Sequence, residues 1–114
     1  MPKCNLIVDD HANIRKVMRD FLENETSFKV CGEAVDGYDA IQKVKDLNPD
    51  LIILDFSMPK MNGIEAARVL KKILPQTPIV MLTSHHPSVL GYDTHAVGID
   101  AVVAKDGGMA ALHG

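Results

Sequence analysis

The feature that most constrains the fold is a set of four short apolar runs, each followed at once by a polar or charged side chain. The side chains that follow the runs are Asp9, Asp55, Thr83 and Lys105. Short apolar runs bounded by turn residues are typical of buried strands, so each of these residues is expected at the carboxyl end of a strand. In an open parallel sheet the carboxyl ends form one edge, where ligands bind. The pattern therefore predicts that the four side chains meet at one edge of a parallel sheet.

Strand-like and helix-like periodicity alternate along the chain. We expect strands at residues 3–8, 28–34, 51–54, 79–82 and 101–104, and helices at about 12–24, 40–48, 64–74 and 87–97. The helix expected at 87–97 has the weakest periodicity, because Gly91 and Thr94 lower helix propensity there. Strands that alternate with helices over short connections favour right-handed crossovers and a parallel sheet with helices on both faces.

Composition restricts the classes of partner. With 114 residues and no low-complexity tract, the chain is expected to form one domain. Its formal net charge of -3 does not favour binding to nucleic acid or anionic lipid, which are themselves negatively charged. We therefore expect no direct DNA contact by this segment. No apolar run reaches membrane-spanning length, which argues against a membrane partner. Cys4 and Cys31 lack metal-ligand spacing, and we expect buried free thiols in a reducing cytoplasm rather than a disulfide or a zinc site.

The acidic residues at the predicted edge also have structural explanations. An aspartate at a strand end, such as Asp55, commonly forms a turn, and Asp9 or Asp10 would cap the helix that follows. One aspartate is enough for a cap, however, whereas adjacent carboxylates repel and become tolerable beside a divalent cation. The combination at one edge therefore favours a functional site.

These residue types suit phosphoryl transfer. A carboxylate such as Asp55 can accept a phosphoryl group as a nucleophile, which forms an acyl phosphate. Mg²⁺ is the natural counter-ion, because it is held by few carboxylates together with waters and the phosphate itself. Asp10, Asp55 and a backbone carbonyl near Ser57 are the expected ligands, with Asp9 holding a metal-bound water. Lys105 would pair with the phosphoryl oxygens.

Thr83 offers a basis for switching. Its hydroxyl can donate a hydrogen bond to a phosphoryl oxygen only once that oxygen exists. This contact would distinguish the two chemical states of the site.

The chain resembles the receiver domain of bacterial two-component response regulators. The matching segments, in the family's order and at its spacing, are Ile7-Val8-Asp9-Asp10, Asp55 with Met58-Pro59-Met61-Gly63, Thr83-Ser84 and Lys105. The resemblance covers nearly the whole chain and implies a flavodoxin-like α/β fold with a five-stranded parallel sheet of order 2-1-3-4-5. It also implies that residues 1–114 are one receiver domain, expected to be the N-terminal part of a longer cytoplasmic protein.

The resemblance assigns a role to each residue at the predicted edge. Asp55 would be the phosphoacceptor, served by a sensor histidine kinase or a small phosphodonor. Asp9 and Asp10 would form the Mg²⁺ pocket, Thr83 would be the switch hydroxyl, and Lys105 would be the phosphate partner. Such a domain is not an enzyme in the usual sense, although it catalyses its own phosphoryl transfer and dephosphorylation.

The end of the sequence departs from the family pattern. Val102 stands where the family usually carries an aromatic residue that reports phosphorylation. Lys105-Asp106 is frequent among regulators with a helix-turn-helix output domain, which favours a transcriptional output. The Gly-rich residues 106–114 are too short for the family's last helix, which we expect to be truncated or absent. The strands left uncovered would expose an apolar patch, so we expect self-association as a dimer or poor solubility of the isolated chain.

Three other functions use a similar fold or site. A haloacid-dehalogenase-type phosphatase needs a second acid two residues after its nucleophile, where this chain has Ser57. A flavin-binding protein needs a phosphate loop after the first strand, where Asp9-Asp10 repels phosphate. A receiver that acts as an interaction module without phosphorylation stays an alternative. His85 is either a residue that affects dephosphorylation or a solvated loop histidine.

Overall fold

The protein is an α/β domain with one parallel sheet. The computed structural model describes residues 3–25, 28–83 and 96–104. Its elements are β1 (Lys3–Val8), α1 (Ala12–Glu25), β2 (Phe28–Ala34), α2 (Gly37–Leu47), β3 (Leu51–Asp55), α3 (Gly63–Ile73), β4 (Ile79–Thr83) and β5 (Ala101–Ala104). All neighbouring strands are parallel, in the order β2-β1-β3-β4-β5. The expected fold class and strand order are confirmed.

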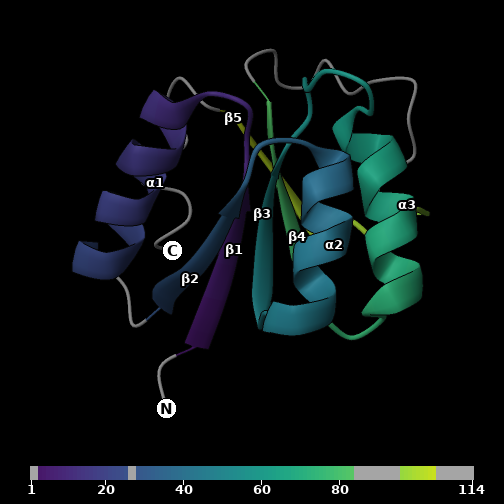
Figure 1. Ribbon diagram of the computed structural model, residues 1–114, viewed down its shortest axis with the longest axis horizontal. Helices are drawn as coiled ribbons and strands as arrows, with labels where there is room; N and C mark the ends of the chain where they lie inside the picture. The colour runs from purple at the N-terminus through teal and green to yellow at the C-terminus, as the bar shows by residue number, and fades with distance from the viewer. Residues whose placement is uncertain (1–2, 26–27, 84–95, 105–114) are drawn as a thin grey trace.

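Helices cover both faces of the sheet, with α1 on one side and α2 and α3 on the other (Figure 1). Because side chains alternate along a strand, each central strand supplies both cores. Leu6 of β1 and Ile52 of β3 pack in the cluster that includes residues of α2 and α3. Ile7 and Ile53 pack in the second cluster, with Met18 of α1. These near-continuous apolar strands hold the carboxyl ends of β1 and β3 side by side.

The helices that precede and follow β3 begin at side-chain caps. Asp36 accepts a hydrogen bond from the backbone N–H of Asp39 at the start of α2. Asn62 and Glu65 form a reciprocal capping box at the start of α3. The apolar positions that mark α2 in the sequence begin at Ala40, and the cap at Asp36 starts the helix three residues earlier, at Gly37. These caps satisfy backbone N–H groups that have no partner within the helix.

Two expectations about the later part of the chain stay untested. The helix expected at 87–97 falls mostly outside the described residues, and its last two positions, Ala96 and Val97, lie in a turn. Residues 106–114, where a truncated or absent helix was expected, also lie outside the described ranges. Within those ranges, no helix is long and apolar enough to cross a membrane.

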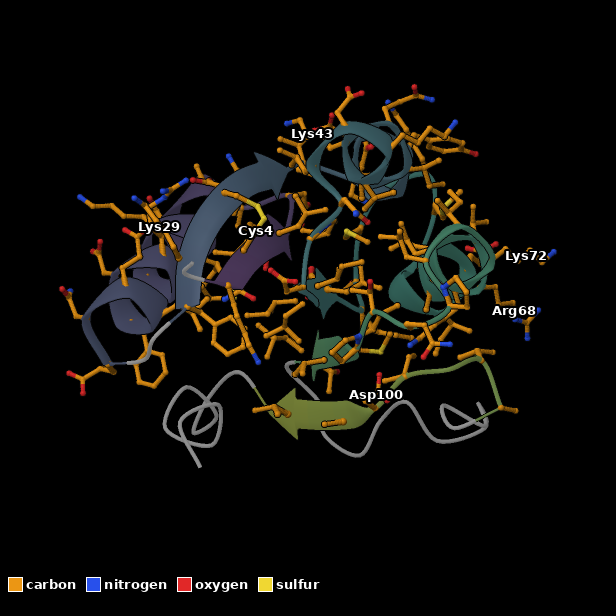
Figure 2. All side chains as sticks on the ribbon, turned by 90° about the horizontal axis from the view of Figure 1, so that it is seen from below. Cys4, Lys29, Lys43, Arg68, Lys72 and Asp100 are labelled. Atoms are coloured by element: carbon orange, nitrogen blue, oxygen red, sulfur yellow. A yellow bond between two sulfur atoms is a disulfide. The ribbon has the colours of Figure 1, made fainter. Side chains whose placement is uncertain are left out.

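The expectation of two buried free thiols is wrong. Cys4 of β1 and Cys31 of β2 form a disulfide, visible as a yellow bond between the two strands in Figure 2. Their Cα atoms are 5.3 Å apart, within the usual range for a disulfide. Cys4 is only half-buried and Cys31 is exposed. The pairing depends on strand adjacency and on an irregularity in the β1–β2 register, neither of which residue spacing reveals.

Candidate functional site

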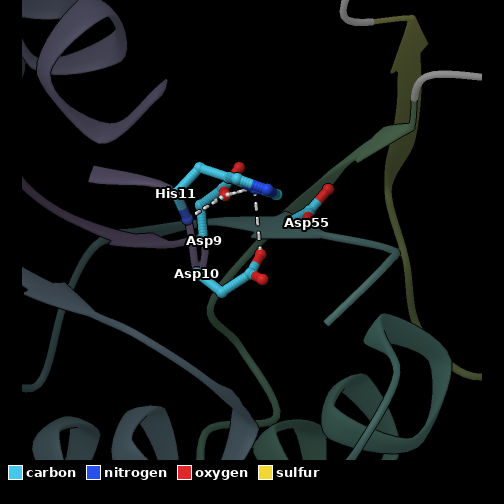
Figure 3. Close-up of side chains that lie close together, drawn as sticks. All are labelled: Asp9, Asp10, His11 and Asp55. Carbon is cyan, nitrogen blue, oxygen red and sulfur yellow. Dashed lines mark hydrogen bonds and ion pairs between the residues drawn. The ribbon is translucent and has the colours of Figure 1, made fainter. Parts of the chain in front are cut away.

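The structure brings three of the predicted acidic residues together. Asp9 and Asp10 follow β1, Asp55 ends β3, and these two strands pair directly, with Val8 opposite Leu54. One side-chain ligand atom from each aspartate and one from His11 all lie within 4.8 Å of one another (Figure 3). Asp9 and Asp55 are 0% and 2% exposed, whereas Asp10 and His11 are exposed. The site therefore combines two buried carboxylates with two groups open to solvent.

Thr83 lies at the same edge of the sheet. It is the last residue of β4 and is buried. The neighbouring Leu82 pairs with Asp55, and its carbonyl accepts a hydrogen bond of 2.8 Å from the backbone N–H of Phe56. The hydroxyl is thus on the strand next to the one that ends in Asp55.

The remaining predicted residues are described only in part. Lys105 lies outside the described residues, but β5 ends at Ala104, which pairs with Thr83. His85 is also outside them. Ser57 is exposed in the segment between β3 and α3. Val102 is partly buried and packs against the core cluster shared with α2 and α3.

His11 was not among the residues predicted from sequence to form this site. Its backbone N–H donates a hydrogen bond of 2.8 Å to Asp9 Oδ1. Its ring Nδ1 lies 3.2 Å from the same oxygen and 3.1 Å from Asp10 Oδ1. The sequence signal is its place immediately after the acidic pair, but spaced histidine motifs do not include a single histidine of this kind.

Arg15 was also missed. Its Nη1 donates a hydrogen bond of 2.7 Å to the backbone carbonyl of Asp9. Its Nε donates one of 2.8 Å to Glu33 Oε1 on β2. Arg15 therefore ties α1 and the end of β2 to the backbone that carries the acidic pair.

Glu33 is held between two arginines, since Arg19 Nη2 donates a hydrogen bond of 2.7 Å to its other oxygen. Burial by itself raises the pKa of the Glu33 carboxyl, but the hydrogen bonds and charges of Arg19 and Arg15 outweigh it. The net result is a pKa below the ordinary value of 4.5. Glu33 therefore stays ionised at acidic pH values where a free glutamate takes up a proton.

We expect Glu33→Gln to lose a pH-dependent part of the stability. Because the folded-state pKa is lowered, this part is fully present above the unfolded-state pKa and is lost as the pH falls through the folded-state value. The difference in free energy of unfolding between wild type and Glu33→Gln should thus be largest near pH 7 and shrink below about pH 4.5. Urea unfolding over this pH range measures it. The same comparison in a chain that carries Arg15→Gln and Arg19→Gln is the control, and an undiminished pH dependence there would contradict the assignment.

The segment between β3 and α3 is tightly constrained. Lys60 has a positive φ of 71°, and the N–H of Met61 donates a hydrogen bond of 2.7 Å to the carbonyl of Pro59. The N–H of Gly63 donates one of 2.8 Å to the carbonyl of Phe56. These hydrogen bonds hold the start of α3 against the end of β3, where Asp55 lies.

Comparison with known proteins assigns the family. The model of the response regulator receiver domain matches residues 6–114. A protein-glutamate methylesterase/protein-glutamine glutaminase of Pyrococcus horikoshii is 44% identical over 79 residues, which are 69% of this chain and 21% of that protein. The response regulator protein VraR of Staphylococcus saprophyticus is 39% identical over 105 residues, 92% of this chain and 50% of that protein. The chain thus spans half or less of the length of these relatives.

Solved structures agree with this assignment. The response regulator domain of Thermotoga maritima CheB has a TM-score of 0.83 and 32% identity, covering 96% of this chain and 82% of that one. A LuxR-family two-component response regulator from Aurantimonas has a TM-score of 0.89 and 27% identity, covering 98% of this chain and 80% of that one. The match to the receiver-domain model from Leu6 to the last residue, on the same fold, shows that the chain belongs to the response regulator receiver family.

Proposed function

We propose that this receiver domain is switched by phosphorylation of Asp55. The observation that carries the proposal is the position of Asp55, buried at the end of β3 with its carboxylate in the same cluster as those of Asp9 and Asp10. A cluster of carboxylates is costly to desolvate, and a scaffold that only binds partners has no need of it. The family assignment supports a role in two-component signalling.

The donor set fits Mg²⁺. The ion prefers oxygen ligands and is typically held by one or two carboxylates, waters and substrate phosphate. We propose Asp10, Asp55 and the backbone carbonyl of Ser57 as ligands, with Asp9 holding a bound water. When bound, Mg²⁺ would neutralise the charge on the phosphoryl oxygens.

Asp55 would act as the nucleophile toward a phosphohistidine of a sensor histidine kinase. A carboxylate oxygen of Asp55 forms a bond to phosphorus, the bond from phosphorus to the donor's imidazole nitrogen breaks, and the electron pair stays on that nitrogen. The proposed role of Lys105 is to pair with the transferred phosphoryl group, and that of Thr83 is to donate its hydroxyl to one of the new oxygens. Because the hydrogen bond from Thr83 can form only after transfer, it would bias the domain toward its active state.

We propose that the output of the switch is the regulation of transcription. We also propose that the protein is cytoplasmic. The proposal of a transcriptional output is supported by the similarity to the response regulator VraR and to the LuxR-family response regulator from Aurantimonas. The methylesterase relative shows that an enzyme can also carry a similar segment, although the similar region is only 21% of its length. Self-association of this domain stays a prediction.

Incubation with acetyl phosphate, followed by intact-mass measurement, tests this function. We expect an adduct of one phosphoryl group that depends on Mg²⁺ and is absent from Asp55→Ala. Asp46→Ala, which changes an exposed aspartate of α2, is the matched control and should retain the adduct. A folded wild-type protein that binds Mg²⁺ but forms no adduct would contradict the proposal and favour the interaction module.

A further inference from the structure

The ring nitrogen of His11 lies at a distance from two carboxylates that suits a shared metal ion. Nδ1 is 3.1 Å from Asp10 Oδ1 and 3.2 Å from Asp9 Oδ1. Two ligands at right angles around an ion, with bonds of about 2.1 to 2.2 Å, are separated by roughly 3.0 to 3.1 Å. His11 Nδ1 and Asp10 Oδ1 therefore already have nearly the spacing of neighbouring ligands in one coordination shell.

The backbone holds the imidazole in this place. The N–H of His11 donates to the Asp9 oxygen that Nδ1 also faces, which fixes the turn before α1. Arg15 fixes the same turn from the other side through the carbonyl of Asp9. The side chain of His11 is 63% exposed, so an ion can reach the nitrogen from solvent.

A nitrogen ligand changes which ions the pocket favours. Mg²⁺ prefers oxygen ligands, whereas imidazole suits zinc, copper, iron and nickel ions, and the affinity of a mixed nitrogen and oxygen site rises from Mn²⁺ toward Cu²⁺. From three carboxylates alone, we would expect a site suited to Mg²⁺. His11, the fourth member of the cluster, makes it a site with both nitrogen and oxygen ligands.

We propose that His11 Nδ1 is a direct metal ligand, and that the acidic pocket therefore binds first-row transition-metal ions such as Mn²⁺ more tightly than Mg²⁺. This inference rests on the proposed function, because it concerns the same pocket. The inference adds that the coordination shell of the metal ion contains a nitrogen atom, from the imidazole of His11. Loss of the imidazole should lower Mn²⁺ affinity by about tenfold or more, as removal of even an outer-shell partner often does. Mg²⁺ affinity should change little, since Mg²⁺ gains least from a nitrogen ligand.

Mn²⁺ binding can be followed by electron paramagnetic resonance, and nitrogen ligation by electron spin-echo modulation from ¹⁴N. We expect the wild-type protein with Mn²⁺ to show imidazole nitrogen coupling. His11→Phe should lose both the coupling and the tighter Mn²⁺ affinity. His11→Asn, which puts an amide oxygen near the position of Nδ1, should lose the nitrogen coupling but keep part of the affinity. His95→Asn is the histidine control and should behave like wild type.

The outcomes separate this inference from the proposed function. Bound Mn²⁺ with only oxygen ligands, or nitrogen coupling lost in His95→Asn instead, would overturn the role of His11 while leaving the metal pocket intact. Equal loss of Mn²⁺ and Mg²⁺ affinity in His11→Phe would also overturn it, because the residue would then act by supporting the turn. Failure of the wild-type protein to bind either ion would overturn both proposals.

Discussion

Gly63→Ala is expected to reduce phosphorylation of Asp55 by acetyl phosphate up to about a hundredfold, because small displacements of a reacting group are costly. A Cβ at this position would lie 2.7 Å from the backbone oxygen of Asp55 and 2.9 Å from Phe56 Cα. Both contacts are with backbone, which cannot move without shifting the strand end that carries the nucleophile. Overpacking of this kind also lowers the free energy of unfolding by about 1–3 kcal/mol.

Gly37→Ala is the matched control for this prediction. Its Cβ would meet Met61 Sδ at 2.6 Å, but that atom belongs to a flexible side chain that can move aside. The adduct should therefore form in Gly37→Ala at a rate close to wild type. Rates of adduct formation, measured by intact mass well below the unfolding transition, separate the loss of geometry from the loss of stability. A wild-type rate in Gly63→Ala would show that the strand end tolerates the displacement.

Reduction of the Cys4–Cys31 disulfide is expected to lower the free energy of unfolding by about 3.5 kcal/mol, from the chain-entropy relation for cross-links. The two residues are 27 apart in sequence, so the bond closes a loop that includes α1 and restricts the unfolded chain. This is a large fraction of the 5–15 kcal/mol by which domains are typically stable. Urea unfolding with and without a reductant measures the change.

The double variant Cys4→Ser/Cys31→Ser is the control for reduction. It should be as unstable as the reduced wild type and should not respond to the reductant. Phosphorylation below the unfolding transition should be unaffected, because Cys4 lies near the start of β1 whereas the acidic pair follows its end. Two reactive thiols in the purified protein, or equal unfolding midpoints with and without reductant, would contradict the disulfide.

Strand ends were predictable from sequence because the signal is local. An apolar run that stops at a polar residue identifies a buried strand and its carboxyl end without knowledge of its neighbours. Asp9, Asp10 and Asp55 could therefore be placed at one edge once alternation with helices had indicated a parallel sheet. The strand order itself came from resemblance to a family, since periodicity does not say which strands pair.

Contacts between distant segments could be decided only by the tertiary structure. Cys4 and Cys31 form a disulfide because β1 and β2 are adjacent and their register shifts between Asn5 and Leu6. Arg15 reaches Glu33 because α1 packs beside β2, and these residues are 18 apart in the sequence. His11 faces both acids because the turn before α1 folds its ring back over them. Sequence alone thus determined which residues stand at the edge of the sheet, while packing decided their partners, since pair distances depend on how the elements are arranged in space.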